Sequence, residues 1–110
     1  TGGWFPFWAA PEQVRILTIN DTVLEYVDKI TTILSDITLM KPVRYNDVRF
    51  TIDSRNESLG KKIREATSMK IPVQLIVGPK DMEANEVSVR TQSGEEKISL
   101  EQLAEYIKSL

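Results

Sequence analysis

Four side chains in this sequence have the chemistry to read the edges of unpaired bases in RNA. They are Asn56, Lys61, Arg64 and Arg90. Arginine and asparagine pair with base edges through two hydrogen bonds at once, and bases in RNA loops expose their edges because they are unpaired. These residue types therefore indicate recognition of an RNA loop. The alternative for each is the ordinary role of a solvated surface side chain.

Two spacings place these candidates on defined surfaces. Gly60 and Arg64 are four residues apart on a predicted helix, so they share one face, and the missing side chain at Gly60 lets a nucleotide approach the backbone. The alternative is that Gly60 only occupies the first turn of that helix. Arg90 follows Val89 in an alternating segment, so we expect Val89 to point inward and Arg90 to point toward solvent or ligand.

Residue types that most enzymes depend on are missing. The chain has no cysteine and no histidine, which removes thiolate nucleophiles, disulfides, and the commonest metal ligand and proton shuttle. Glu95 and Glu96 are adjacent acids beside a predicted turn, where nothing supplies the burial that a general acid needs. Gly2 and Gly3 do not continue into a phosphate-binding pattern. We therefore expect no catalysis by this chain alone, and no metal or cofactor in it.

The amino-terminal segment is rich in aromatic residues. Its four large rings are Trp4, Phe5, Phe7 and Trp8. Such rings can stack on bases, but this spacing around a proline favours packing against the domain or a neighbouring one. The segment lacks the basic start and unbroken apolar stretch of a signal peptide, and no apolar run is long enough for a membrane span. We expect an intracellular protein that does not contact membranes.

Positive charge is concentrated in the middle of the chain. Residues 41–70 hold eight basic and four acidic side chains, whereas residues 1–40 hold two and five, and residues 71–110 hold four and seven. The net charge of −2 therefore hides a basic segment between two acidic ones. This pattern fits a local phosphate contact better than the broad basic surface that DNA binding needs, although a solvated helix face is the alternative.

The elements that position these residues follow from length and periodicity. A chain of 110 residues with 41% hydrophobic content corresponds to one globular domain. Alternating and β-branched segments predict strands, and apolar residues at spacings of three and four predict helices. We expect five strands near residues 14–19, 48–52, 73–77, 87–91 and 97–98, and three helices near residues 22–37, 58–67 and 99–107. Thr22 with Glu25, and Ser99 with Gln102, have the spacing of capping boxes and are expected to begin the first and last of these helices.

The order of these elements predicts an α/β fold of three-layer α/β/α type. A mixed five-stranded sheet would be covered by three helices, with right-handed crossovers between its parallel strands and the segment 73–77 at its centre. Ligands of such sheets bind outside the carboxyl ends of the parallel strands. Those ends are predicted at residues 18–20, 53–56 and 78–81.

Four segments, taken in order, resemble one protein family. Residues 53–66 read DSRNESLGKKIREA, and they follow WFPFWAAPEQVRIL at 4–17. IPVQLIVGPKDME at 71–83 and VSVRT at 87–91 come next, at matching distances. Together they are similar to the anticodon-binding domain of threonyl-tRNA synthetases, which are class II aminoacyl-tRNA synthetases.

The resemblance implies an organisation and a set of partners. Residues 1–12 would connect to a catalytic domain outside this sequence, and residues 13–110 would bind the anticodon stem-loop of a threonine tRNA. The parent threonine-tRNA ligase would use ATP, Mg and Zn in that catalytic domain and would form a homodimer. The connection over residues 37–47 is longer than in most bacterial members and is similar to some mitochondrial ones. Both cytoplasm and mitochondrial matrix therefore stay open.

The family pattern also implies which residues contact the anticodon. The main positions are Asn56, Arg64, Lys80, Asp81 and Arg90. Further candidate positions around them are Thr18, Asn20, Arg55, Gly60, Lys61 and Glu83.

For the middle guanine of a threonine anticodon, the resemblance implies a shared reading by an arginine and an acid. Arg90 would donate to O6 and N7, while a carboxylate would accept the hydrogens of N1 and N2. The family usually has glutamate where Asp81 stands, and Glu83 is the alternative acid. Two other interpretations stay open. GPKDME also resembles the loop of prolyl-tRNA synthetases, and the negative net charge would suit a docking module that has lost RNA binding.

Overall fold

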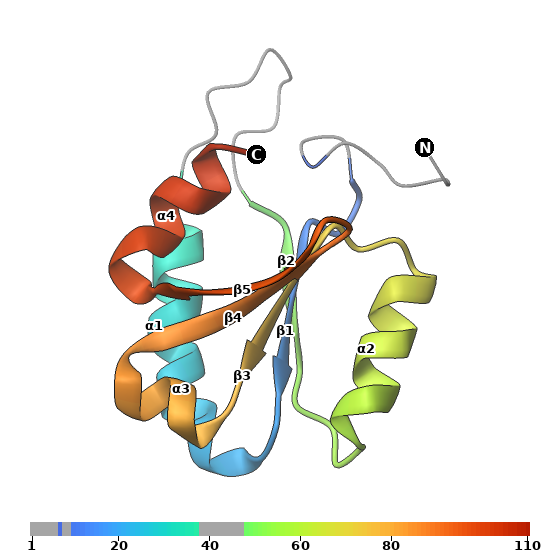
Figure 1. The fold of residues 1–110 in the computed structure, drawn as a ribbon, viewed down its shortest axis with the longest axis vertical. Coiled ribbons are helices and arrows are strands. Elements are labelled where there is room, and N and C mark those ends of the chain that lie inside the picture. Colours follow the sequence, from blue (N-terminus) through green and yellow to red (C-terminus); the bar gives the residue numbers. More distant parts are fainter. Residues whose placement is uncertain (1–6, 8–9, 38–47) are drawn as a thin grey trace.

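The computed structural model describes residues 7, 10–37 and 48–110. They form the expected α/β domain around a mixed five-stranded sheet (Figure 1). The strands are β1 (Val14–Thr18), β2 (Phe50–Asp53), β3 (Val73–Val77), β4 (Glu86–Thr91) and β5 (Gly94–Ser99). The helices are α1 (Leu24–Ser35), α2 (Leu59–Ser68), α3 (Pro79–Ala84) and α4 (Leu100–Lys108), and a 3-10 turn, η2 (Asp21–Val23), precedes α1.

The strand order is β2-β1-β3-β4-β5, with β3 at the centre as predicted. β1 runs parallel to both β2 and β3, while β4 and β5 form an antiparallel hairpin beside β3. All five residues of β3 are buried, because helices cover both of its faces. The carboxyl ends of β1, β2 and β3 consequently meet at one edge of the sheet, which we call the carboxyl edge.

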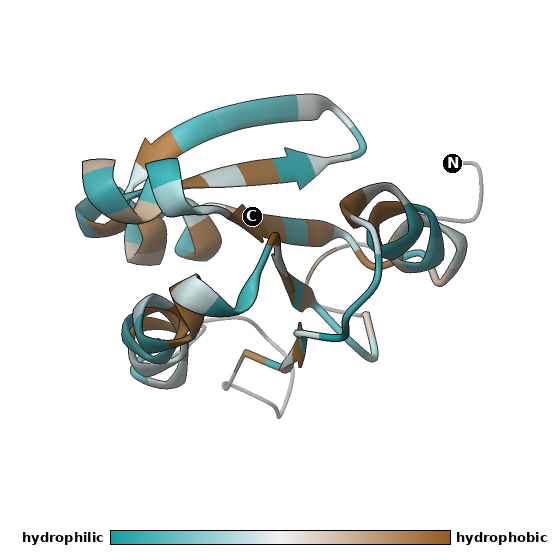
Figure 2. Cartoon of the chain, turned by 90° about the horizontal axis from the view of Figure 1, so that it is seen from below, coloured by the Kyte–Doolittle hydropathy of each residue, from teal (hydrophilic) through white to brown (hydrophobic). Residues whose placement is uncertain are grey.

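The two faces of the sheet are covered unequally. α1 and α4 lie on one face, the α1/α4 face, where their apolar stripes close the main core over Ile16, Leu75 and Val89. α2 lies alone on the other face, the α2 face, above Leu17 and Ile76. Figure 2 shows that β5, at the outer side of the sheet, is largely hydrophilic. The α2 face is therefore open over the β4–β5 hairpin.

Phe7 confirms the predicted packing role of the aromatic segment where the structure describes it. Its side chain is 8% exposed and belongs to the main core. The other rings of that segment, at positions 4, 5 and 8, lie outside the described residues, as does most of the connection over residues 37–47. Burial of Phe7 fixes where the chain enters the domain.

One prediction about the helices was wrong. The described residues contain four α-helices instead of three, because residues 79–84 form α3 where a loop was expected. Pro79 occupies the first helical position, and the Asp81 carboxylate accepts the Gly78 N–H. A helix of six residues is too short to show apolar periodicity, which is why the pattern missed it.

Helix beginnings were predicted with mixed success. Ser99 and Gln102 form the expected capping box of α4, and Ser58 caps α2. At the first helix, however, the predicted cap residue Thr22 does not act as the cap. The Asn20 side chain accepts from the Thr22 N–H and so begins η2, which leads into α1. A short asparagine side chain at this point competes successfully for the first free N–H groups.

Asn85 ends α3 in the left-handed conformation, with φ of 58°. We expect Asn85→Gly to keep or slightly raise the free energy of unfolding, because glycine adopts this conformation without steric cost. Asn85→Val should lower it by about 1–2 kcal/mol. Urea unfolding of both variants beside the unchanged chain tests this, and equal losses for glycine and valine would contradict it.

Candidate functional site

The carboxyl edge brings together the three strand ends that the sequence predicted. β1 ends at Thr18, β2 ends at Asp53, and β3 leads through Gly78 into α3 (Figure 1). Because α2 begins shortly after β2, its first turn lies at this edge as well. Most of the predicted RNA contacts are therefore neighbours in space.

A buried lysine joins three of these elements. Lys62 is 1% exposed, and its Nζ donates to the backbone oxygen of Thr18 at 2.8 Å and lies 3.4 Å from Thr18 Oγ1. The Thr18 hydroxyl in turn donates to the backbone oxygen of Asp53 at 3.4 Å. This chain of contacts ties α2 to β1 and β2. Thr18, a candidate contact residue, is 1% exposed and serves this internal network.

The sequence reasoning missed Lys62. It lies in a helix whose apolar residues include Leu59 and Ala66, three before and four after it. A lysine inside an apolar stripe was the available signal, but a lysine at the border of such a stripe usually reaches solvent with its charged end. Only the tertiary structure shows that the end of β1 offers it a partner.

An ion-pair group fixes the loop between β2 and α2. Arg55 donates from Nε to Asp53 Oδ1 at 2.8 Å and from Nη2 to Oδ2 at 2.9 Å, and it also contacts the Glu65 carboxylate. These hydrogen bonds from Arg55 lower the pKa of the Asp53 carboxyl, although burial opposes them. Arg55 is therefore engaged by two acids, and it orients the loop in which Asn56 is exposed.

Asn56, Lys61 and Arg64 are accessible beside this loop. Asn56 and Arg64 are exposed, and Lys61 is about half exposed with its Nζ 3.3 Å from Glu57 Oε2. Gly60 is the second residue of α2, in its first turn. A Cβ built there would lie 3.6 Å from Arg64 Nη1, so the guanidinium of Arg64 lies beside the bare glycine backbone. Asn20 is also exposed, at the end of β1.

Arg90 lies on the α2 face of the hairpin. β4 pairs so that Arg90 stands between Gln74 of β3 and Glu95 of β5, while Val89 is buried on the other face as expected. The Arg90 side chain is 44% exposed, and its Nη1 lies 3.9 Å from Glu95 Oε1. An ion pair of this length between half-exposed groups is weak, so the Arg90 guanidinium is available to bind a ligand.

The two candidate acids of α3 differ sharply in their surroundings. Asp81 is 5% exposed, and its Oδ2 accepts the Gly78 N–H at 3.0 Å. Its Oδ1 faces Lys97 of β5, whose Nζ lies 3.2 Å away. Glu83 and Lys80 are exposed on the same helix. The sequence reasoning did not select Lys97, because only the strand pairing and the position of α3 bring it to Asp81.

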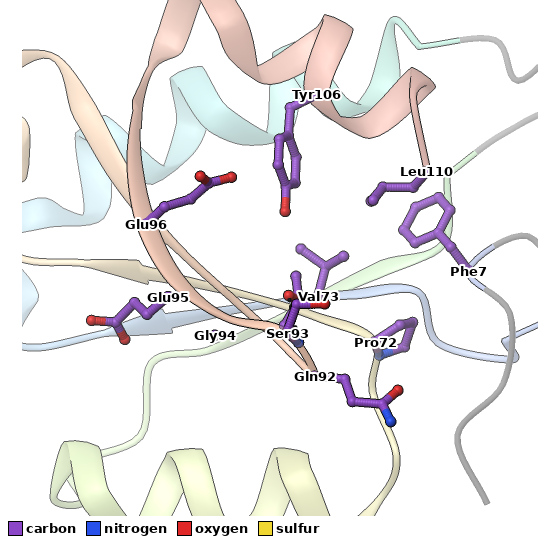
Figure 3. Close-up of a pocket in the computed structure, with 11 residues that line it drawn as sticks. Phe7, Pro72, Val73, Gln92, Ser93, Gly94, Glu95, Glu96, Tyr106 and Leu110 are labelled. Carbon is purple, nitrogen blue, oxygen red and sulfur yellow. Dashed lines mark hydrogen bonds between the residues drawn. The ribbon is translucent and has the colours of Figure 1, made fainter. Parts of the chain in front are cut away.

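A cavity of about 420 Å³ lies away from this site, at the amino end of β3 (Figure 3). Tyr106 extends into it from α4, with Phe7 and Leu110 on one side and Glu96 on the other. Burial raises the pKa of Tyr106, with a smaller contribution from the charge of Glu96. Among the described residues, the lining includes two glutamates and no basic side chain, and this charge is unsuited to the RNA backbone.

Within residues 7, 10–37 and 48–110, acidic side chains do not cluster in a way that could hold a metal ion. Across the same part of the chain, every helix is too short or too polar to cross a membrane.

Comparison with known proteins matches this chain to one family. The family model described as anticodon binding domain matches residues 13–110. Threonine–tRNA ligase of Clostridium botulinum strain Hall is 40% identical over 109 residues, which cover 97% of this chain. The enzyme of the same name from Maridesulfovibrio salexigens is 40% identical over 111 residues, or 99% of this chain. The chain spans 16% of the length of each of these relatives.

Solved structures share the fold. The RNA binding domain of threonyl-tRNA synthetase from Cryptosporidium parvum superposes with a TM-score of 0.82 at 24% identity, covering 98% of this chain and 26% of that one. Prolyl-tRNA synthetase from the same organism, complexed with halofuginone and AMPPNP, superposes with a TM-score of 0.79 at 23% identity. That match covers 96% of this chain and 22% of the other.

Replacing Lys62 by methionine tests the internal network. We expect Lys62→Met to lower the free energy of unfolding by about 1–3 kcal/mol, because the buried Thr18 carbonyl loses its donor. The neighbouring exchange Lys61→Met, at a more exposed position, should change it by less than about 0.5 kcal/mol. Chemical denaturation of both variants measures the difference, and equal effects of the two exchanges would show that Lys62 contributes no specific stability.

The lowered pKa of Asp53 predicts a pH dependence. Since the folded pKa lies below the unfolded value of about 3.9, the stabilisation is present above that pH and is lost as the pH falls through the folded pKa. Asp53→Asn should therefore be less stable than the unchanged chain near neutral pH, and this difference should shrink below about pH 4. Thermal unfolding between neutral and acid pH measures it, with Asp28→Asn on α1 as the control. Parallel stability curves would contradict this account.

Proposed function

The chain belongs to the anticodon binding domain family, and from that membership we propose that it binds the anticodon loop of a threonine tRNA across the carboxyl edge and the α2 face. The observation that carries the proposal is the family match over residues 13–110. The exposed residues Asn56, Arg64 and Arg90 support it, because they present amide and guanidinium groups where an unpaired loop can reach them.

We further propose that this chain is the anticodon-binding part of a threonine–tRNA ligase. Relatives of that name are 40% identical across nearly all of the chain, which spans 16% of their length. Aminoacylation, with its ATP and Mg, would belong to the catalytic domain of the parent protein. The chain alone would therefore bind tRNA without threonine activation, and its partners would be the tRNA and that catalytic domain.

Within the site, we propose a division of roles. Asn56 and Arg64 form one wall at the beginning of α2, and Lys61, which belongs to the basic segment of residues 41–70 and is about half exposed, supplies a phosphate contact. Arg90 donates to O6 and N7 of the middle guanine from the open side of the hairpin. An acid of α3 accepts from the Watson–Crick edge of the same base, where N1–H and the N2 amino group are donors, and Asp81 and Glu83 are the two candidates.

A prolyl-type specificity is the second candidate. It is favoured by the segment GPKDME at residues 78–83, which resembles the corresponding loop of prolyl-tRNA synthetases. Threonine and proline anticodons share the middle G and differ at the third base. Binding to stem-loops with U or G at that third position separates the two. Preference for U supports the threonine assignment, and preference for G supports the proline one.

Base reading at the middle position is tested by titrating the chain with a threonine anticodon stem-loop and with one carrying A in place of the middle G. We expect the A form to bind about tenfold more weakly at fixed salt. Arg90→Ala should remove most of that preference. The control Lys29→Ala removes one charge from α1, on the other side of the sheet, and should preserve the preference. Equal affinity of the unchanged chain for both RNAs would refute base reading.

A further inference from the structure

A buried acid at the carboxyl edge is only half satisfied. Asp81 Oδ2 accepts the Gly78 N–H, but among the described residues Oδ1 has no hydrogen-bond partner. Lys97 Nζ is 3.2 Å from Oδ1, near enough for an ion pair, although the geometry of this contact is not that of a hydrogen bond. A buried acceptor without a donor is unfavourable. Asp81 Oδ1 therefore has the capacity to accept a hydrogen bond from an N–H group of a ligand.

The ion-pair partner of this acid is exposed by comparison. Lys97 is 57% exposed along its side chain, whereas the Asp81 side chain is 7% exposed. Strand pairing sets Lys97 opposite Ser88, on the same face as Arg90. The ammonium therefore comes from the open hairpin and reaches the edge where the RNA site is proposed.

Three groups follow one another on this side of the molecule. Arg90 of β4 is paired with Gln74 of β3. Lys97 of β5 is paired with Ser88 of β4, which is in turn paired with Ile76, two residues nearer the carboxyl end of β3. Asp81 comes just beyond the end of β3, in α3. The order toward the carboxyl edge is therefore hydrogen-bond donor, donor, acceptor.

Guanine presents the complementary order. Its N7 and O6 accept, and the adjacent N1–H donates, whereas adenine has an acceptor at N7, a donor at N6 and an acceptor at N1. Building on the proposed function, we infer that Lys97 is a specificity-determining residue for the middle guanine. Its ammonium donates to O6 beside Arg90, while Asp81 Oδ1 accepts from N1–H.

This arrangement limits what the acid can read. Asp81 Oδ2 already accepts the Gly78 N–H at the beginning of α3, so we expect the carboxylate to accept one N–H of the base, through Oδ1, instead of two. The exocyclic N2 amino group of guanine is then not read by Asp81. Inosine, which keeps O6 and N1–H but lacks that amino group, binds almost as well as guanine.

The experiment measures binding of the chain to anticodon stem-loops with G, inosine or A at the middle position. The unchanged chain should bind G and inosine within about threefold of each other and A about tenfold more weakly. Lys97→Met should lose most of the preference for G over A, and Lys97→Arg should keep it. The matched control is Lys108→Met, which removes a comparably exposed, acid-paired lysine from α4. Thermal unfolding confirms that each variant is folded.

Four results would overturn the inference. If Lys97→Met weakens all three RNAs equally and reduces the salt dependence, Lys97 is a phosphate contact. If Lys97→Met keeps the full preference for G, Lys97 does not read the base, and the proposed function stands without it. If inosine binds as weakly as A, the acid reads the N2 amino group. If the unchanged chain itself does not prefer G, the proposed function fails as well.

Discussion

The contact between the Lys62 ammonium and the Thr18 carbonyl is the constraint on which the carboxyl edge of this domain depends. A buried ammonium is costly unless hydrogen bonds replace its water, and the end of β1 supplies that replacement. The contact sets where α2 crosses the sheet, and it thereby sets where Asn56 and Arg64 stand relative to the strand ends. The neighbouring group of Asp53, Arg55 and Glu65 then holds the connecting loop. Some charged side chains at this edge therefore stabilise the fold through internal hydrogen bonds and ion pairs, while others are candidate RNA contacts.

The unequal covering of the sheet gives the domain one closed face and one partly open face. α1 and α4 close one face with an apolar core, which includes Phe7 from the entering chain. α2 covers only part of the other face, so Arg90 and Lys97 remain accessible beside it. In antiparallel sheets one face can stay in contact with solvent, and the β4–β5 hairpin has such a solvent-exposed face. Basic and acidic side chains can stand there without the desolvation that burial would impose.

Much of the fold could be predicted, for reasons that lie in particular segments. Val73–Val77 is apolar throughout and was placed at the centre of the sheet, where it lies. Ser99 and Gln102 began the last helix as their spacing indicated. α3 could not be predicted, because one short helix shows no period and depends on a local contact between Asp81 and Gly78. Among the site residues, exposure of Asn56, Arg64 and Arg90 followed from local patterns, whereas the inward position of Thr18 did not.

The sequence by itself determined the fold class, the order of most strands and helices, and the segments that resemble the family. Each of these depends on residues that are close together in the chain. Only the tertiary structure decided which charged groups meet. Lys62 lies 44 residues from Thr18 in the chain, and Lys97 of β5 forms an ion pair with Asp81 of α3. Local periodicity carries no information about such partners, since they are set by how α2 and the hairpin pack against the sheet. The packing of these elements decides whether a charged side chain is solvated or held in an internal contact.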